Sequence, residues 1–229
     1  MNFLALTPEE KVTSGLAVRR GEWEGDGSLV MITRDGVAKK SDASAFKDVR
    51  RSGLIGINLA DGDALIAARF VGKGDEVSLI TSKGQSIRFK ESDVREMGRT
   101  AAGVRAMKIG KGDRIVSADV IRKDMKDCEI LVVMEHGYGK TTSAKEYKVQ
   151  NRSGSGIKTA KITSKTGEIV GATVIMSDER AEGELIVMSK KGQVIKLPLK
   201  DVPNLGRDTQ GVRVMKMREG DSIASIVYF

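Results

Sequence analysis

The sequence predicts an all-β fold built from repeats, and three observations support this. An apolar run ends four times at a short turn that closes on a glycine, and these glycines are 48, 53 and 55 residues apart. A second glycine follows each of them after 17 to 19 residues. No segment carries the sustained 3.6-residue apolar period of an amphipathic helix. Such a fixed period is typical of repeat proteins, in which each unit buries its faces against its neighbours. The turn glycines are Gly36, Gly84, Gly137 and Gly192, and the second glycines are Gly53, Gly103, Gly156 and Gly211.

The second repeat shows why four strands are expected in each unit. Residues 77–81 are short, apolar and partly β-branched, which is typical of a strand. Gly84 supplies the positive φ that a hairpin turn needs. Residues 85–90 then alternate polar and apolar side chains, as a half-buried return strand does. A polar connection leads to a third strand at 104–109, and a turn leads to a fourth at 114–121.

The other repeats follow the same order, and four strands in a unit of this length are typical of a propeller blade. A single helical turn at most is expected near residues 200–203 and their equivalents. The strands are expected at 29–33, 37–41, 54–59 and 64–71 in the first repeat, at 129–134, 139–143, 157–162 and 168–175 in the third, and at 184–189, 193–198, 212–217 and 222–229 in the fourth.

The repeats predict one partial domain over residues 1–229. Its units are a half-unit at 1–25 and full units at 26–73, 74–125, 126–181 and 182–229. Residues 2–6 and 11–18 match only the second half of a repeat. The chain is therefore expected to be a fragment of a longer array, or to use the half-unit to supply strands to the first blade, or both.

Composition limits the functional classes. Hydrophobic residues make up 40% and charged residues 31% of the 229, which excludes a disordered chain and favours a globular one. No apolar run is long enough to span a membrane, and the start lacks the pattern of a signal peptide. The single cysteine, Cys128, excludes an intrachain disulfide and fits a reducing cytoplasm.

Charge favours a polyanionic partner. The formal net charge is +8, which indicates nucleic acid among other acidic ligands. Aromatic residues make up only 4% of the chain. Because binders of single strands stack bases on aromatic side chains, this scarcity favours contact with the phosphates of a duplex.

Four segments carry a resemblance to a known family. They are residues 29–40 (LVMITRDGVAKK), 49–59 (VRRSGLIGINL), 103–109 (GVRAMKI) and 206–216 (GRDTQGVRVMK). They resemble the C-terminal domain of the A subunit of bacterial DNA gyrase, and of its counterpart in topoisomerase IV, over nearly the whole chain. The resemblance implies a β-pinwheel whose blades exchange strands and whose outer rim binds and bends duplex DNA.

The resemblance also implies the setting of this domain. It would be the non-catalytic part of an ATP-dependent type II topoisomerase in the bacterial cytoplasm, associated with the chromosome. Its partners would be double-stranded DNA, the rest of the A subunit and the ATPase subunit, and it would need no cofactor. The gyrase hallmark heptapeptide is absent, because residues 19–22 (RRGE) place an acid where a glycine belongs. The hallmark is expected upstream of Met1, and the choice between gyrase and topoisomerase IV stays open.

Basic residues recur in phase with the repeats, which predicts a charged stripe on the rim. Phosphate contacts position a duplex without reading its sequence, and many weak contacts along an arc can offset a bending cost of about 1–6 kcal/mol. The alternative for each residue is a solvated strand face. The predicted DNA-binding residues are Lys39, Lys40, Arg50, Arg51, Arg88, Lys90, Arg99, Arg105, Lys108, Lys140, Arg152, Lys158, Lys161, Lys196, Arg207, Arg213 and Lys216.

Three details of this pattern lead to structural expectations. Arg105 and Lys108 are three residues apart, so a regular strand would point them to opposite faces. Two alternatives stay open: one of the two faces the neighbouring blade, or a bulge re-aims it. The second glycines have two interpretations, turn geometry or close approach to phosphate. The third repeat keeps the glycine and basic positions, but its strand sequences are less apolar, which predicts a different blade geometry.

No catalytic or metal-binding arrangement is present in the sequence. Residues 153–159 lack the spacing of a phosphate loop, and His136 is the single histidine. The tyrosines at 138, 147 and 228 do not match the catalytic segment of the resembling family. The acids at 63, 113, 168 and 221 are expected to be structural turn residues. The rival functional hypothesis is a propeller that serves as a protein-interaction platform.

Overall fold

The computed structural model describes residues 12–16, 25–49 and 53–229. In these ranges the chain forms strands and short 3-10 turns without an α-helix, so the all-β prediction is confirmed. No helix among them has the length and apolar character to cross a membrane. The strands are β1 (Ser28–Thr33), β2 (Val37–Asp42), β3 (Leu65–Val71), β4 (Glu76–Thr81), β5 (Gln85–Lys90), β6 (Val104–Arg105), β7 (Ile115–Ile121), β8 (Cys128–Met134), β9 (Tyr138–Ser143), β10 (Ile157–Lys158), β11 (Ile169–Met176), β12 (Glu184–Ser189), β13 (Val194–Pro198), β14 (Val212–Arg213) and β15 (Ile223–Tyr228).

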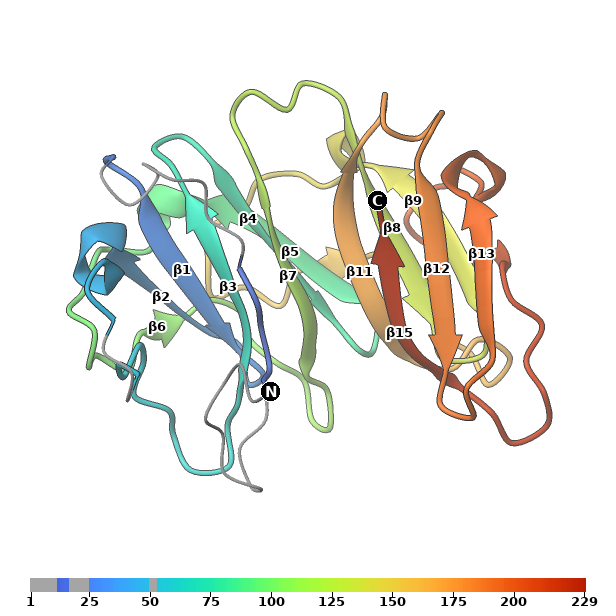
Figure 1. The fold of residues 1–229 in the computed structure, drawn as a ribbon, viewed down its shortest axis with the longest axis horizontal. Helices are drawn as coiled ribbons and strands as arrows, with labels where there is room; N and C mark the ends of the chain where they lie inside the picture. Colours follow the sequence, from blue (N-terminus) through green and yellow to red (C-terminus); the bar gives the residue numbers. More distant parts are fainter. Residues whose placement is uncertain (1–11, 17–24, 50–52) are drawn as a thin grey trace.

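The strands form four antiparallel sheets, one for each repeat (Figure 1). Their orders are β3-β1-β2-β6, β7-β4-β5-β10, β11-β8-β9-β14 and the three-stranded β15-β12-β13. The third sheet has the same order as the first two, so the expected difference in its blade geometry does not extend to its topology. The 3-10 turns at Ala43–Phe46, Glu91–Asp93, Ala144–Glu146 and Leu199–Asp201 are the single helical turns that the sequence predicts.

The third strand of a repeat completes the sheet of the preceding repeat. β6 of the second repeat pairs with β2 of the first, β10 pairs with β5, and β14 pairs with β9. This confirms the strand exchange that the resemblance implied. Each exchanged strand supplies one edge of a sheet, and the fourth strand of the sheet's own repeat supplies the other edge.

The exchanged strands are much shorter than the sequence suggested. Six-residue strands are predicted at 104–109, 157–162 and 212–217, but only the first two residues of each segment pair. The backbone N–H groups of Ala106 and Met107 both donate to the Gly36 carbonyl, at 2.8 and 3.2 Å. The chain therefore leaves the ladder and wraps over the hairpin turn of the preceding blade. The strand expected at 54–59 is absent, since no preceding sheet is present among the described residues to pair with it.

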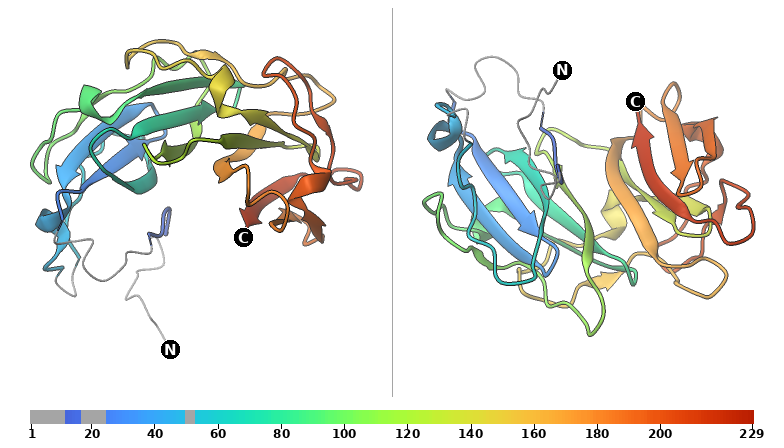
Figure 2. Two further views of the ribbon diagram at one scale, coloured as in Figure 1. Left: turned by 90° about the horizontal axis from the view of Figure 1, so that it is seen from above. Right: turned by 60° about the horizontal axis from the view of Figure 1, so that its bottom comes forward.

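The four sheets follow an open arc, as Figure 2 shows in its left view. The fourth strands contact one another from blade to blade, β3 with β7, β7 with β11 and β11 with β15. These strands therefore form the inner side of the arc, and the exchanged strands occupy the outer edges of the sheets. Most of the expected half-unit lies outside the described residues. Residues 12–16 carry no strand, and the Ser14 hydroxyl accepts a bond from the Ala68 N–H at 3.2 Å.

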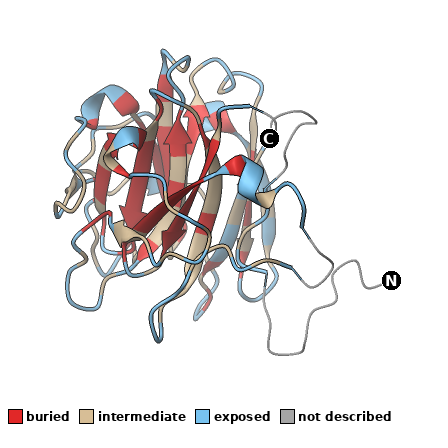
Figure 3. Cartoon of the chain, turned by 90° about the vertical axis from the view of Figure 1, so that its left-hand side faces the viewer, coloured by how far each residue is buried: buried red, intermediate tan, exposed pale blue. Residues whose placement is uncertain are grey.

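The core lies between neighbouring sheets, which explains why one repeat alone would expose its apolar faces. One buried cluster joins Val30 and Ile32 of the first sheet to Leu79 and Phe89 of the second. Two further clusters join the second sheet to the third and the third to the fourth. Figure 3 shows this burial along the strands, with exposed residues concentrated in the connections.

The turn acids are structural, as expected. The Asp221 carboxylate accepts from the Ser189 hydroxyl at 2.6 Å and from the Lys191 and Ser222 N–H groups at 3.1 and 2.8 Å. Asp113 accepts from the Ser82 hydroxyl and the Lys83 N–H in the β4–β5 turn, and Asp63 accepts from the Asp35 N–H in the β1–β2 turn. Glu168 differs, because its carboxylate forms an ion pair with Arg114 at 3.1 Å.

The bond from the Ser189 hydroxyl, with help from the two backbone bonds, holds the pKa of Asp221 below its usual range. A carboxyl with a lowered folded-state pKa stabilises the fold above its unfolded-state pKa and loses that effect as pH falls through the folded value. We therefore expect Asp221→Ala to lower the melting temperature by several degrees at pH 7, and by less near pH 3. Thermal unfolding of both proteins at the two pH values measures this, and a difference that does not depend on pH would contradict it.

Candidate nucleic-acid interface

Three basic residues occupy the same position on the three exchanged strands. Arg105, Lys158 and Arg213 are the second residues of β6, β10 and β14, and they pair with the residue after the turn glycine of the preceding blade. All three side chains are exposed. Because the exchanged strands form the outer edges of three successive sheets, these cations lie in a row along the outside of the arc.

A second set of cations follows three residues later. Lys108, Lys161 and Lys216 are exposed as well. A regular strand would point Arg105 and Lys108 to opposite faces, but the strand ends at Arg105, so this conflict does not arise. Ala106 and Met107 turn inward and are buried, and Lys108 returns to the surface. Each exchanged strand therefore presents one exposed cation, and the segment that follows it presents a second.

The second glycine lets the exchanged strand approach the neighbouring sheet. Gly103 has a φ of +94°, and a Cβ placed there would lie 2.7 Å from the Ala38 carbonyl oxygen. A side chain at this position would be strained and would push β6 away from β2. The close approach that sequence reasoning left open therefore exists, but the group approached is the backbone of the preceding blade.

Three of the predicted DNA-binding lysines are buried, which corrects the expectation that they lie on the surface. Lys140 is 0% exposed, and its ammonium donates to the Gly206 and Arg207 carbonyls at 2.7 and 2.6 Å and to the Thr209 hydroxyl at 3.0 Å. Lys39 is also 0% exposed and donates to the Gly56 and Arg99 carbonyls. Lys40 pairs with Glu91 at 2.5 Å inside the protein. A buried ammonium needs such hydrogen-bond partners, and an ammonium that is buried with them is not available to a DNA phosphate.

Two further predicted cations are held by acids on the neighbouring strand. Arg88 is half-buried, and its Nε donates to the Glu76 carboxylate at 2.5 Å while Nη1 donates to the Ala144 carbonyl at 2.7 Å. Lys196 is exposed and pairs with Glu184 at 2.8 Å, which is the equivalent pair in the fourth repeat. Lys90 is exposed at the end of β5. Arg50 and Arg51 lie outside the described residues.

Two predicted arginines tie the third and fourth repeats to the preceding exchanged strand. Arg152 donates from Nη1 to the Arg105 carbonyl at 2.9 Å, and Arg207 donates from Nη1 to the Lys158 carbonyl at 2.8 Å. Both are half-buried, as is Arg99. These guanidinium groups position the backbone that carries the exposed cations, a role that spacing alone did not indicate.

Sequence reasoning missed a tyrosine next to this row. The Arg213 guanidinium donates to the Tyr138 hydroxyl at 3.3 Å and stacks 5.7 Å from its ring centre, and Lys165 lies 5.4 Å from the same ring. The bond from Arg213, followed by the charges of Arg213 and Lys165, lowers the pKa of the Tyr138 phenol. Lys165 falls outside the in-phase positions, so the repeat pattern could not reveal it.

The fold and this row of cations define a class of protein, an open β-pinwheel of strand-exchanging repeats with a basic outer side. In the described part of the chain, no group of three or more His, Cys, Asp or Glu side chains is arranged to hold a metal ion. The family model of the DNA gyrase C-terminal domain, a β-propeller, matches residues 27–71, 75–122, 129–176 and 183–228. The chain therefore belongs to the family of DNA gyrase C-terminal domains, as the resemblance indicated.

Curated relatives agree with this assignment. The chain is 38% identical over 226 residues to the DNA gyrase A subunit of Staphylococcus epidermidis, an alignment that covers 99% of this chain and 25% of that protein. It is also 38% identical over 227 residues to the DNA gyrase A subunit of Mycolicibacterium smegmatis, with 98% and 26% covered. The chain thus spans about a quarter of the length of these relatives.

Solved structures show the same fold. The C-terminal domain of a DNA topoisomerase IV aligns with a TM-score of 0.88 at 25% identity, covering 99% of this chain and 68% of that one. A DNA gyrase A C-terminal domain aligns with a TM-score of 0.83 at 26% identity, covering 99% and 73%. The β-pinwheel prediction is therefore confirmed.

The buried lysines lead to a test of the loops they hold. Lys140→Met removes the donor of the Gly206 and Arg207 carbonyls, so we expect a lower melting temperature and faster amide exchange in residues 206–209. Lys145→Met is the matched control, because its side chain is 74% exposed and forms a surface ion pair with Asp127. Equal effects of the two substitutions would contradict the role of Lys140.

Burial lowers the pKa of Lys140 from 10.5 to about 8. Between these values the unfolded chain binds a proton that the folded protein does not bind, so stability rises with pH. We expect the difference in unfolding free energy between the unmodified protein and Lys140→Met to increase as pH rises from about 8 towards 10.5. Urea unfolding across this range measures it, and a difference that falls with pH would contradict the lowered pKa.

Proposed function

We propose that this chain binds duplex DNA along the outer side of the arc and bends it, as the DNA-wrapping part of the A subunit of a type II topoisomerase. The observation that supports this most strongly is the row of six exposed cations. Each exchanged strand carries one of them and the segment after it carries a second, and the three strands lie on successive sheets. The row consists of Arg105, Lys108, Lys158, Lys161, Arg213 and Lys216. These six stay predicted DNA contacts, as do Lys90 and Lys196.

The arrangement of the row suits a bent duplex. Phosphates repeat along the helix, so cations that repeat along an arc can contact them at successive turns without reading bases. Bending a site of 20–30 base pairs by 40–90° costs about 1–6 kcal/mol, which several weak contacts can offset. The shortage of aromatic residues, at 4% of the chain, agrees with contacts to the backbone instead of to unstacked bases.

The assignment to a larger enzyme is part of the same proposal. The gyrase relatives are about four times longer than this chain, so the chain would act with the rest of its own A subunit and with an ATPase subunit. It would contribute DNA binding, with strand breakage and ATP use located elsewhere in the enzyme and no cofactor of its own. We propose a cytoplasmic, chromosome-associated, gyrase-type enzyme over topoisomerase IV because the Staphylococcus and Mycolicibacterium relatives are gyrase proteins. We also propose that residues 1–229 act as one domain.

A salt titration tests the electrostatic contacts. Replacing Arg105, Lys158 and Arg213 by alanine removes one cation from each exchanged strand. We expect weaker binding to duplexes of any sequence and a shallower dependence of log affinity on log salt, by about 0.9 for each phosphate that is no longer neutralised.

The matched control replaces Lys111, Lys123 and Lys126, which are exposed in the connections that flank the inner strand β7. This triple variant changes the net charge equally. If both triple variants weaken binding to the same extent, only the net charge matters and the outer row is not the DNA path.

A circle-relaxation assay tests bending and wrapping. Nicked plasmid is ligated with increasing amounts of the protein, and we expect a shift in linking number whose sign gives the handedness of the wrap. Binding without a shift in linking number would contradict chiral wrapping, although DNA binding itself would still be supported. Failure to bind duplex at low salt would overturn the proposal and favour the protein-interaction platform.

A further inference from the structure

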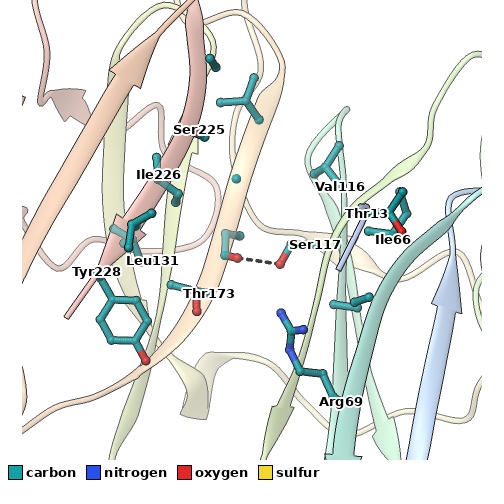
Figure 4. Close-up of a pocket in the computed structure, with 17 residues that line it drawn as sticks. Thr13, Ile66, Arg69, Val116, Ser117, Leu131, Thr173, Ser225, Ile226 and Tyr228 are labelled. Atoms are coloured by element: carbon teal, nitrogen blue, oxygen red, sulfur yellow. Dashed lines mark hydrogen bonds between the residues drawn. The ribbon is translucent and has the colours of Figure 1, made fainter. Parts of the chain in front are cut away.

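The inner edges of the sheets meet through side chains. A cleft of about 590 Å³ lies between the inner strands β3, β7, β11 and β15. Next to it the Ser117 hydroxyl of β7 donates to the Ala172 carbonyl of β11 at 2.6 Å, which is the dashed line in Figure 4. Two residues along β7, the Asp119 carboxylate accepts from the Val174 N–H and the Thr173 hydroxyl of β11, both at 3.0 Å. Side chains of β7 thus satisfy edge groups of the next blade.

These bonds satisfy backbone N–H and carbonyl groups of an edge strand that would otherwise have no hydrogen-bond partner. β11 pairs with β8 on one side, and no strand among the described residues pairs with its opposite edge. The Val174 N–H on this edge donates to Asp119 of the preceding blade, and the Val174 carbonyl accepts from the Tyr228 hydroxyl of the following blade at 3.3 Å. Unpaired edge groups are costly when buried and promote wrong pairing when exposed. The bonds therefore fix how β11 sits between its neighbours.

Asp119 also reaches the first sheet. Its other oxygen lies 3.5 Å from Nε of Arg69, a residue of β3. The Arg69 and Asp119 side chains are 35% and 23% exposed, so solvent screens this pair only in part. One carboxylate therefore contacts the first and third sheets while belonging to the second.

The repeats differ at this position although they agree elsewhere. Arg69, Asp119, Thr173 and Val227 are equivalent, since each lies four residues after the first aligned inner-strand residue of its sheet. A cation, an anion, a hydroxyl and an apolar group thus replace one another in successive repeats. The shared repeat geometry does not require any of them. The chemistry at each blade junction is therefore particular to that junction.

We propose that Asp119 is a positioning residue that sets the angles between the first three blades and thereby the curvature of the DNA path, an inference that rests on the proposed function. The exposed cations Arg105, Lys158 and Arg213 lie on the first, second and third sheets respectively. Their separation along the arc depends on two junctions, β3 with β7 and β7 with β11. Asp119 forms interactions across both junctions.

The test compares Asp119→Ala with Asp124→Ala. Asp124 follows β7 in the chain, its side chain is 73% exposed, and its ion pair joins it to Arg122 in the same connection. Both substitutions change the net charge equally, and neither removes a rim cation. The readouts are small-angle X-ray scattering of the free protein, the linking-number shift per bound protein, and the salt dependence of duplex affinity.

For Asp119→Ala we expect an altered scattering profile and a linking-number shift that is reduced by about half or more. The reason is that DNA resists bending, so a more flexible arc is partly straightened by the DNA and bends it less. The slope of log affinity against log salt should differ from that of the unmodified protein by less than about 0.9, which is the contribution of one phosphate contact. Asp124→Ala should match the unmodified protein in scattering and in linking number. This separation of bending from phosphate contact is not expected from a residue that only stabilises the fold.

Identical scattering profiles for Asp119→Ala and Asp124→Ala would overturn the proposal, whether or not the protein binds DNA. Absence of DNA binding by every protein, including the unmodified one, would instead overturn the proposed function, and scattering would still decide the role of Asp119. If Asp119→Ala does not fold, Asp119→Asn and Arg69→Ala take its place. The amide oxygen of Asn keeps an acceptor for Val174, and Arg69→Ala opens only the β3–β7 junction. An unchanged profile in both would equally overturn the proposal.

Discussion

The structure depends on a two-residue strand that the second, third and fourth repeats each give to the preceding sheet. β6, β10 and β14 complete three sheets, and the residues after them donate to the carbonyl of the preceding hairpin turn. This short pairing requires glycine just before the strand, since a side chain at Gly103 would collide with the Ala38 carbonyl. Because the exchanged strand occupies the outer edge of its sheet, the strand that links two repeats also places a basic side chain on the outside of the arc.

The basic residues that recur in the repeats form two groups, one internal and one exposed, which the sequence pattern does not distinguish. Lys39 and Lys140 are fully buried and hold loop carbonyls, and the half-buried Arg152 and Arg207 hold the exchanged strands. The exposed group, which includes Arg105 and Lys108, lies on the surface, where Lys158 pairs with Asp208 at 3.8 Å and Arg213 donates to Tyr138. The internal group therefore builds the backbone from which the external group projects. Replacing a cation of the first group perturbs the shape of the surface, while replacing one of the second group perturbs its charge.

The inner side of the arc has a different chemistry from the outer side. The outer edges of the first three sheets are joined to the next repeat by the same backbone pairing, whereas the inner edges are joined by side chains that differ from repeat to repeat. Backbone pairing keeps the unit constant, and variable side chains allow the angle between units to vary. A protein of this design can keep one repeat sequence pattern and still adjust the overall curvature by changing single residues on the inner strands, such as the one at Asp119.

The repeat period, the all-β class, the hairpins and the structural turn acids could be predicted from the sequence, because turn glycines and apolar alternation are local signals. The repeat pattern also identified Arg105, Lys158 and Arg213 as equivalent positions. The burial of Lys39, Lys40 and Lys140 and the end of the third strand after two residues could not be predicted, since both depend on a neighbouring repeat that donates or accepts backbone bonds. The interactions of Asp119 with Arg69 and Val174 likewise join residues about 50 positions apart, and no local pattern in the chain encodes them.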